Sequence, residues 1–455
     1  MTRSIAKKAD GLPRQLPGLV STPGEDRYLA ATRIWAKQPD IQPAAIIHCR
    51  SSADVQAAMR AARERDLPIS VRGGGHDWAG RALCDGLVID LSAIRDVTIA
   101  PDRRSAMIGG GACAADVTAV ADPLGLVAAA GSAGCVGMTG LALGGGYGPL
   151  IGRYGLALDN VIEAEVVLAD GSFVTANAEG NQELLWALRG GGGNFGVVTA
   201  MRHRLHELPS VHAALLVYPF TEAKAVLEKC AALAATMPDE FTVQFVILFG
   251  PDGTPMVFVV PCWCGGPEEG EARLTPFLKL GTLLAGKIEQ QTHGALLSIF
   301  DASLINGLRI FGRSCWLPSL NAASIDTIIA VTNDAPAPGC MIVSHDFKGA
   351  ASRVAGDATA FRLRRDHVML EFVAAFPDRG SAQDETEHRD WARNSCEAFA
   401  GALPGGYPNF LGRDEQDRAT MSYGGNAERL IQAKRRYDPD NVFSSAIPLP
   451  RGGHH

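Results

Sequence analysis

The stretch Arg72-Gly-Gly-Gly-His-Asp-Trp-Ala-Gly80 decides the fold of this chain. It directly follows an apolar run, Leu67–Val71, that is typical of a buried strand. Three consecutive glycines offer backbone N–H groups with no side-chain bulk in front of them. Such a loop can hold a pyrophosphate without a helix. The alternative is a glycine-rich turn that carries a surface histidine, and the stretch alone leaves both interpretations open.

A second glycine-rich stretch, GSAGCVGMTGLALGGGYG at residues 131–148, lies about 60 residues further along the chain. Its glycines Gly137, Gly140 and Gly144–Gly146 permit a flat group to lie directly against the backbone. Two such stretches favour one large, phosphate-bearing cofactor held between them.

A third stretch, Gly191-Gly-Gly-Asn-Phe-Gly196, matches the G-x-G-x-x-G pattern of dinucleotide-binding turns. That turn must follow a strand and open a helix, so that the helix N-terminus meets the pyrophosphate. Here a helical segment, 181–188, comes before the glycines and a strand-like run, 197–205, comes after them. The reversed order disfavours a nicotinamide-dependent dehydrogenase.

Bulk composition excludes several classes of protein. The 455 residues are 47% apolar and 20% charged, with a net charge of -7. These values are those of a globular chain, and they match neither a disordered protein nor the basic surface of a nucleic-acid-binding protein. We expect no membrane span, because no run of about 18 apolar residues occurs. We also expect no secretory signal, because the N-terminus lacks an apolar stretch.

The ten cysteines are scattered without a framework, so we expect reduced thiols and a cytoplasmic protein. Cys262 and Cys264 form a C-x-C pair, but no second pair of ligands lies nearby. Structural zinc needs four ligands, so we expect no metal.

The pattern of elements divides the chain into three parts, with boundaries at 38–208, 209–405 and 406–447. Residues 43–71 read as a β-α-β unit that leads into the first glycine stretch. The Asp170-Gly171 turn marks a hairpin over 161–176. From residue 209, strand-like and helical runs alternate as in a separate α+β domain. We expect the first 37 residues, which are polar and contain several prolines, to form a loose lead-in.

At this point the motifs resemble those of a known family. The chain is similar to the berberine-bridge-enzyme-like branch of the vanillyl-alcohol-oxidase flavoproteins, over about residues 40–445. The likeness rests on six motifs in the family's order: Arg72–His76, Val136–Gly146, Ala187–Gly196, Tyr407-Pro-Asn-Phe410, Tyr423-Gly-Gly-Asn426 and Tyr437–Phe443.

The resemblance implies an α+β fold with a PCMH-type FAD-binding domain of two subdomains. It implies a second α+β domain that lays an antiparallel sheet over the flavin ring, and a final segment that returns to the FAD domain. It also implies a covalent bond from His76 to the 8α carbon of the flavin. The residues expected to hold FAD are Arg72, Gly73, Gly74, Gly75, His76, Val136, Gly137, Gly140, Gly144, Gly145, Gly146, Gly196, Val197, Asn409, Tyr423 and Asn426.

At three positions the sequence differs from many relatives, so the roles of the relatives' residues at these positions do not apply to this chain. Many relatives attach the flavin a second time through a cysteine, but Ala133 holds that place and Cys135 lies two residues later, which predicts a single link. Phe410 stands where many plant relatives have a catalytic tyrosine. The alkaloid-cyclising members use a carboxylate as the base, and the corresponding position in this sequence is near Arg353.

The family reaction moves a hydride from a substrate C–H to flavin N5 while a base removes a proton from a neighbouring O–H or N–H. Our first candidate for the base is Asp346, in the strand-like run 340–347. The period of two places it opposite to His345, which we expect to point away from the flavin. Glu371 and Tyr423 are the other candidates for catalysis.

The resemblance also favours an oxidase that reduces O2 to H2O2, because relatives gate oxygen at the position of Val136. A dehydrogenase with another acceptor stays open. The substrate is a small molecule oxidised at an alcohol, a sugar-like or polyketide-like hydroxyl, or a cyclic amine. A flavin-binding protein without turnover is the alternative from another class. The sequence does not predict the oligomeric state.

Overall fold

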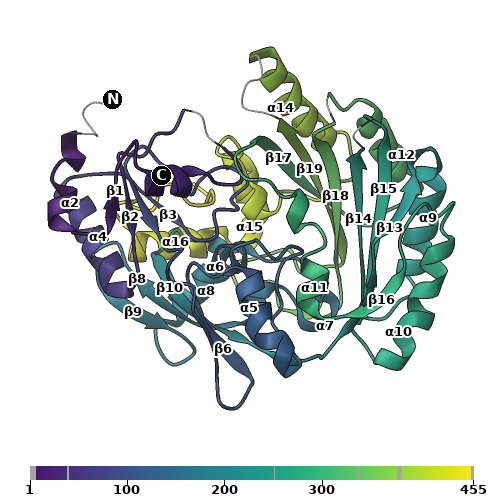
Figure 1. Ribbon diagram of the computed structural model, residues 1–455, viewed down its shortest axis with the longest axis horizontal. Coiled ribbons are helices and arrows are strands. Elements are labelled where there is room, and N and C mark those ends of the chain that lie inside the picture. Colours follow the sequence, from purple (N-terminus) through teal and green to yellow (C-terminus); the bar gives the residue numbers. More distant parts are fainter. Residues whose placement is uncertain (1–6, 38–39, 251, 337, 377–381, 452–455) are drawn as a thin grey trace.

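Three main β-sheets and one two-stranded sheet (β7 Leu126–Val127 with β11 His206–Glu207) organise the chain in this computed structural model, which describes residues 7–37, 40–250, 252–336, 338–376 and 382–451. Two smaller sheets, built from the first half of the chain, lie on one side, and a large sheet lies on the other (Figure 1). The predicted boundary at residue 38 lies outside the described residues.

The first sheet has the strand order β1-β2-β4-β3 and contains the strand that precedes the first glycine stretch. Strands β2 and β3 both run parallel to β4, and helix α4 makes the crossover between β2 and β3. The helix begins after Ser51, whose hydroxyl accepts a hydrogen bond from Asp54 N–H at 3.2 Å. The bounds are β1 Val20–Ser21, β2 Ala45–His48, α4 Ser52–Glu64, β3 Ile69–Arg72 and β4 Leu87–Asp90.

The N-terminal segment is an integral part of this subdomain, so the expectation of a loose lead-in is wrong. Leu12, in helix α2 (Leu12–Gln15), and Leu16 are buried in the core that α4 shares with the first sheet. Trp35 is 1% exposed. A few buried apolar side chains are enough to anchor this segment to the rest of the protein. The expectation failed because it was based on the average polarity of the segment, which does not show single buried residues.

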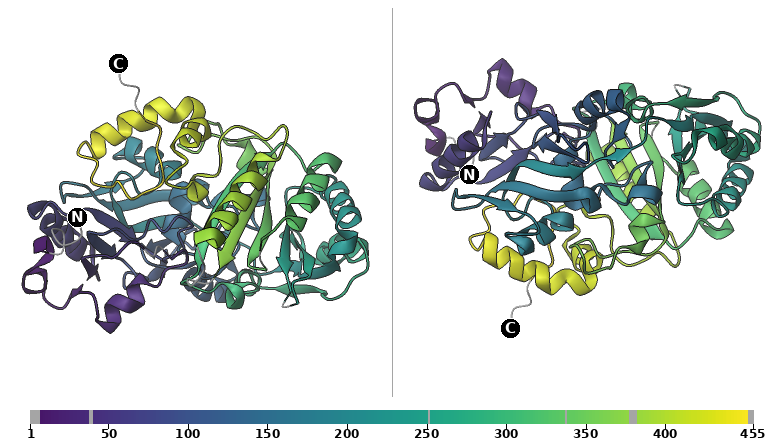
Figure 2. Two further views of the ribbon diagram at one scale, coloured as in Figure 1. Left: turned by 90° about the horizontal axis from the view of Figure 1, so that it is seen from above. Right: turned by 90° about the horizontal axis from the view of Figure 1, so that it is seen from below.

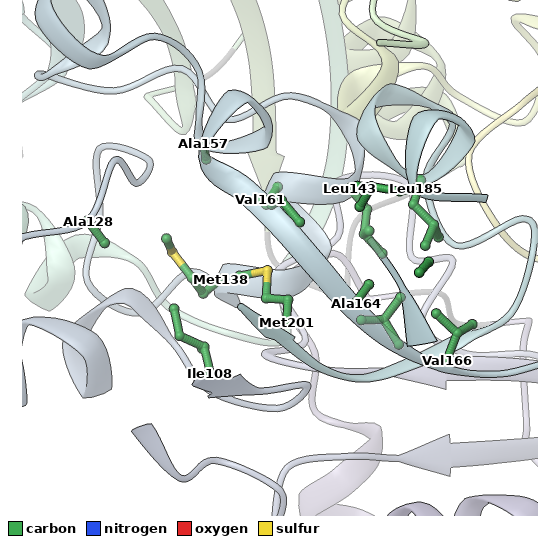
Figure 3. Packing of buried hydrophobic residues seen from close by; sticks show 14 of the residues in the cluster. Ile108, Ala128, Met138, Leu143, Ala157, Val161, Ala164, Val166, Leu185 and Met201 are labelled. Carbon is green, nitrogen blue, oxygen red and sulfur yellow. The ribbon is translucent and has the colours of Figure 1, made fainter. Parts of the chain in front are cut away.

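The second sheet is antiparallel throughout, with the order β5-β6-β10-β8-β9. Figure 3 shows part of its core, in which Ile108, Ala164 and Met201 pack beneath Met138 and Leu143 of the second glycine stretch. The bounds are β5 Val97–Ile99, β6 Ser105–Gly109, α5 Ala114–Ala121, α6 Met138–Gly144, β8 Val161–Val167, β9 Phe173–Ala176, α8 Gln182–Gly191 and β10 Val197–Arg204.

The third sheet has eight strands and is also antiparallel. Helices α9, α10, α12 and α14 cover its outer face, where they share one apolar core with it (Figure 1). The bounds are β12 Val211–Ala214, β13 Leu216–Pro219, α9 Ala223–Ala234, β14 Phe241–Phe249, β15 Pro255–Trp263, α10 Pro267–Leu274, β16 Ile288–Gln291, β17 Arg309–Leu317, α12 Ala322–Asn333, β18 Cys340–Phe347, β19 His367–Phe376 and α14 Ala382–Glu397.

The C-terminal segment lies against the first half of the chain. Helix α16 (Ala427–Tyr437) packs on α8, and its residue Leu430 belongs to the core of the second sheet. Figure 2 shows α15 (Gln416–Tyr423) and α16 on the same side as the two smaller sheets. The predicted α+β architecture, with two subdomains and a separate antiparallel sheet, is therefore confirmed. None of the helices in the described part of the chain has the length and apolarity needed to cross a membrane.

Two buried histidines give the fold a pH dependence. His293, at the start of α11 (His293–Leu297), finds no hydrogen-bond partner among the described residues. Burial lowers its pKa to about 4 and that of His367 to about 3, from the ordinary 6.5. The unfolded chain therefore binds more protons than the folded chain below pH 6.5.

We predict that the free energy of unfolding falls as the pH falls from 6.5 toward 4, by about 1 kcal/mol per pH unit for each of these histidines. Denaturant unfolding at pH 7.5 and pH 5.5 measures this. The His293→Leu variant should show a smaller loss between the two pH values than the wild type. An equal loss in both proteins would contradict the assignment to His293.

Candidate cofactor and substrate site

A cavity of about 410 Å³ lies where both glycine stretches face the large sheet. Its walls come from all three parts of the chain: the loop Gly73–Trp78, the segment Gly131–Leu143, the start of β10, the inner face of the large sheet and the C-terminal residues 443–447. Cavities lined mainly by apolar side chains with a few polar groups are typical of cofactor and substrate sites.

The two glycine stretches touch backbone to backbone. A Cβ atom on Gly74 would lie 2.6 Å from both the Cα and the N atom of Gly137, and a Cβ on Gly137 would lie 2.7 Å from Gly74 N. Real side chains do not approach backbone so closely, so both positions require glycine. Gly75 adds a positive φ of 73°, a conformation that side chains rarely adopt. The contact holds the loop before His76 against the second stretch.

The loop residues 73–76 present free hydrogen-bond donors. Within the described part of the chain, the backbone N–H groups of these four residues meet no acceptor. Buried N–H groups are almost always paired, so a bound group with several acceptor oxygens satisfies them best. Gly140 and Gly193 also line the cavity, and a Cβ at either position would meet nothing within 4 Å. The residues present therefore fit the pyrophosphate of a dinucleotide such as FAD.

His76 lines the cavity at the end of this loop. Burial lowers the pKa of its imidazole to about 4, so the ring is neutral at physiological pH. Its Nδ1 atom lies 4.0 Å from the Sγ atom of Cys135. The indole of Trp35 stacks on the imidazole with a centroid separation of 4.6 Å. Sequence reasoning found His76 but missed Trp35, because no motif includes it.

The inner face of the large sheet supplies the other wall. The register pairs Val246 with Val343 and Val343 with Glu371, so these three side chains form one row across β14, β18 and β19. The next row contains Gln244, His345 and Met369. His345 Nε2 lies 3.1 Å from Glu371 Oε1, and Glu371 is 5% exposed. The side-chain amide of Gln244 lies 3.3 Å from Nδ1 of His345, so these three residues form a polar cluster beside the apolar residues of the same face.

The predicted orientation of strand 340–347 is wrong. His345 lines the cavity, whereas Asp346 lies on the opposite face and its carboxylate accepts a hydrogen bond from Val243 N–H at 3.0 Å. Burial raises the pKa of Asp346. The period of two is correct, but both faces of this strand carry apolar residues, so the sequence does not show which face meets the helices. Asp346 was proposed as the catalytic base because its face of the strand was expected to meet the flavin, and the structure shows that this face points away from the cavity.

Most of the predicted cofactor residues line the cavity, and so does the predicted catalytic residue Glu371. The predicted residues that line it are Gly73, Gly74, Gly75, His76, Val136, Gly137, Gly140, Gly196, Val197, Glu371 and Asn409. They come from segments far apart in sequence, which the fold brings to one place.

The other predicted site residues have structural contacts instead. Arg72 does not line the cavity, because its guanidinium pairs with Asp90 at 2.8 Å. The glycines 144–146 lie behind the wall: Gly144 leaves room for the side chain of Asn409, Gly145 for that of Tyr407 and Gly146 for Ala157. Gly146 N–H donates to the Tyr407 hydroxyl at 2.7 Å.

The predicted roles of Tyr423 and Asn426 at the flavin are not supported, because neither side chain lines the cavity. The Tyr423 hydroxyl is buried and donates to Gly190 O at 3.1 Å. Asn426 Nδ2 donates to the carbonyls of Gly356 and Thr359, at 2.7 and 3.0 Å. Both residues fasten the C-terminal segment to the loops around it.

Aromatic and amide side chains at the end of the cavity complete the wall. Phe410 lines it in place of the tyrosine of many relatives, and it stacks on Trp78 at 4.5 Å between centroids. Asn409 Nδ2 donates to the Tyr407 hydroxyl at 2.8 Å. Arg353 lies outside the cavity and pairs with Asp239 at 2.7 Å.

Comparison with known proteins agrees with this geometry. Residues 43–177 match the model of FAD binding domains, and residues 406–450 match the model of berberine and berberine-like proteins. The (R)-6-hydroxynicotine oxidase of Paenarthrobacter nicotinovorans is 33% identical over 455 residues, covering 95% of this chain and 96% of the relative. An FAD-linked oxidoreductase of Gibberella zeae, aurO, is 30% identical over 447 residues, covering 97% and 86%.

Solved structures show the same fold. The 6-hydroxy-D-nicotine oxidase from Arthrobacter nicotinovorans has a TM-score of 0.84 at 27% identity and covers 95% of this chain and 98% of its own. The berberine-bridge-enzyme-like protein 1 of Physcomitrella patens has a TM-score of 0.84 at 23% identity, with both chains fully covered. The protein therefore belongs to the berberine-bridge-enzyme-like family of FAD-linked oxidoreductases.

We predict that Gly74→Ala and Gly137→Ala each lower the FAD content of the purified protein to less than about a tenth, because the new methyl group separates the two glycine stretches. The absorbance of the flavin relative to that of the protein measures this. Gly180→Ala is the matched control, because a Cβ there meets nothing within 4 Å. Full FAD content in either site variant would contradict the role of this contact.

Proposed function

We propose that the protein is an oxidase that holds FAD through a single covalent bond to His76 and oxidises a small molecule with an apolar body. The observation that carries the proposal is that one cavity contains both His76, at the glycine loop, and the His345–Glu371 pair, on the sheet face. His76 and the glycine loop would hold the flavin, which would supply the hydride acceptor, and the pair on the sheet would take the proton from the substrate.

Two properties of the residues near His76 support a single link. The low pKa leaves the imidazole with a free lone pair at physiological pH, which a nucleophile needs. The Cys135 thiol is near, but burial raises its pKa to about 12, so the reactive thiolate is scarce. Ala133 occupies the place of the second attachment in relatives and lines the cavity without a reactive group.

Proton removal falls to the His345–Glu371 pair. Bound FAD supplies the acceptor for a hydride from the substrate carbon. The two side chains lie on the opposite wall, where they can take the proton from a neighbouring N–H or O–H. A carboxylate that contacts one imidazole nitrogen fixes the tautomer. The side-chain amide nitrogen of Gln244 lies 3.3 Å from Nδ1 of His345 and has to move aside before that nitrogen accepts a proton. Glu371 thus keeps its predicted place in catalysis, with His345 as its partner.

The charge of the cavity favours an amine. Among the described residues that line the cavity, one carries a guanidinium, Arg81, and it is held by Asp77 and by the carbonyls of Leu411 and Asn409. An acidic substrate therefore meets no free cation, whereas Glu371 attracts an ammonium group. The relative at 33% identity is named for 6-hydroxynicotine, which contains a cyclic amine. We propose a cyclic amine as the first substrate class.

The sheet face disfavours a sugar-like substrate. Its polar side chains, Gln244, His345 and Glu371, are grouped together, whereas Val246, Leu248, Met341, Val343 and Met369 are apolar and offer no partners for a row of hydroxyl groups. We propose a less polar alcohol as the second substrate class. Val136 lines the cavity, and we propose O2 as the electron acceptor, with H2O2 as product.

We predict that FAD stays with the polypeptide after acid precipitation of the wild type and that His76→Ala releases it into the supernatant. Cys135→Ser is the control and should retain the flavin, because the link is made by His76 alone. Visible absorption of the pellet and the supernatant distinguishes these results. Complete release of flavin from the wild type would refute the covalent bond, and release from Cys135→Ser would refute the single link.

We predict that Glu371→Gln slows anaerobic reduction of the flavin by about 100-fold or more, the usual scale of general base catalysis. The assay screens a panel of cyclic amines and apolar alcohols by stopped-flow absorbance, and it measures H2O2 in air. Asp346→Asn is the matched control, because this carboxylate lies on the far face of the same sheet. A loss of rate in Asp346→Asn with none in Glu371→Gln would return the assignment to Asp346.

A further inference from the structure

Trp35 has no role in the proposed reaction, yet it makes the closest aromatic contact to His76. Its indole is nearly parallel to the imidazole, with an angle of 14° between the planes and 4.6 Å between the centroids. Trp78 meets both rings edge-on, at 5.4 Å from Trp35 and 5.8 Å from His76. The three rings form an aromatic cluster that surrounds the imidazole on two sides.

The backbone around Trp35 fixes this stack from both halves of the molecule. Trp35 N–H donates to Gly75 O at 2.9 Å, directly before His76. Gly307 N–H donates to Ile34 O at 2.9 Å, and Lys37 N–H donates to Leu308 O at 2.8 Å. The segment 34–37 therefore joins the glycine loop to the stretch that follows Leu304, a residue of the cavity wall.

The indole packs in an apolar cluster with Ile310 and Val373 of the large sheet, and it also stacks on His76. Trp35 is 1% exposed, and its Nε1–H has no acceptor among the described residues. A buried indole N–H usually finds a partner, and leaving it without one is unfavourable. Apolar packing and the stack on His76, rather than a hydrogen bond of the indole, therefore position this ring.

We propose that Trp35 is a positioning residue for covalent attachment of the flavin: it holds the imidazole plane of His76 so that a ring nitrogen points at the 8α carbon. This inference rests on the proposed bond to His76. In the attachment, an N–C bond forms between the imidazole and the 8α carbon, while the 8α C–H and the imidazole N–H bonds are lost. Two protons and two electrons leave in total, and O2 takes them up to give H2O2.

The geometry explains why a loosely held imidazole would react slowly. A neutral His76 has rotational freedom about its side-chain bonds, and the lone pair must point at the reacting carbon for the bond to form. Misplacement of a reacting group by about 1 Å can cost about 100-fold in rate. Trp35 covers one face of the ring and Cys135 lies beside Nδ1, so the remaining orientations are few.

The test compares Trp35→Leu, which keeps an apolar side chain without an aromatic face, with Trp35→Phe, which keeps the face. Each full-length protein is purified, incubated in air with excess FAD, and sampled over time. Total bound FAD is measured after gel filtration, and covalent FAD is measured by fluorescence of the denatured protein on a gel. Leu12→Ala is the control for a loosened N-terminal segment, because Leu12 is buried in the first subdomain and belongs to another core cluster.

We expect Trp35→Leu to bind FAD but to attach it about 100-fold more slowly, whereas Trp35→Phe and Leu12→Ala attach it at close to the wild-type rate. Attachment by Trp35→Leu at the wild-type rate would overturn the inference. So would a parallel fall in bound and covalent FAD, since that is the signature of a merely structural residue. A wild-type protein without covalent FAD would refute the proposed function itself, which is a different result from either of these.

Discussion

The backbone contact between Gly74 and Gly137 is the constraint on which the rest of the site depends. A single Cβ atom at either position would collide with the other strand of backbone. The contact places the loop that ends in His76 against the segment that begins α6, and it leaves the N–H groups of residues 73–76 facing the cavity without acceptors in the described part of the chain. The glycines therefore create both the close approach and the anion-binding surface.

The two halves of the molecule contribute different chemistry to one cavity. The smaller sheets carry the glycine stretches and His76, to which we assign the binding of the cofactor. The large sheet has its outer face covered by helices, so its inner face is free to present Val343, His345 and Glu371 to the cavity. The binding surface is mainly backbone and the reacting surface is mainly side chains. This division allows substrate preference to change by substitution on one sheet while the FAD site stays intact.

Much of this arrangement was predictable from the sequence, because glycine patterns report backbone constraints directly. Gly73–Gly75, Gly137 and Gly196 line the cavity as expected. The bounds of β10, Val197–Arg204, also agree with the expected run 197–205 to within one residue. The reversed order of helix and strand around residues 191–196 disfavoured a nicotinamide-binding turn, and the structure has α8, which ends at Gly191, and then β10, which begins at Val197.

Orientation and long-range contacts were not predictable. Strand β18 is apolar on both faces, so only the packing of helices shows that His345 rather than Asp346 faces the cavity. Tyr423 and Asn426 lie in a motif that resembles a flavin contact, but their partners are the carbonyls of distant loops. Trp35 contacts His76 because the N-terminal segment folds back onto the glycine loop. The polar composition of this segment gave no indication of that contact.

The central claim is that one FAD lies between the two glycine stretches and is bonded to His76. The crystallographic electron density of the purified, yellow protein tests this most directly. The account predicts continuous density from the His76 imidazole to the 8α carbon, with the pyrophosphate over the N–H groups of residues 73–76 and the ring facing His345 and Glu371. Flavin density elsewhere in the molecule, or a clear gap between the imidazole and the ring at full occupancy, would contradict it.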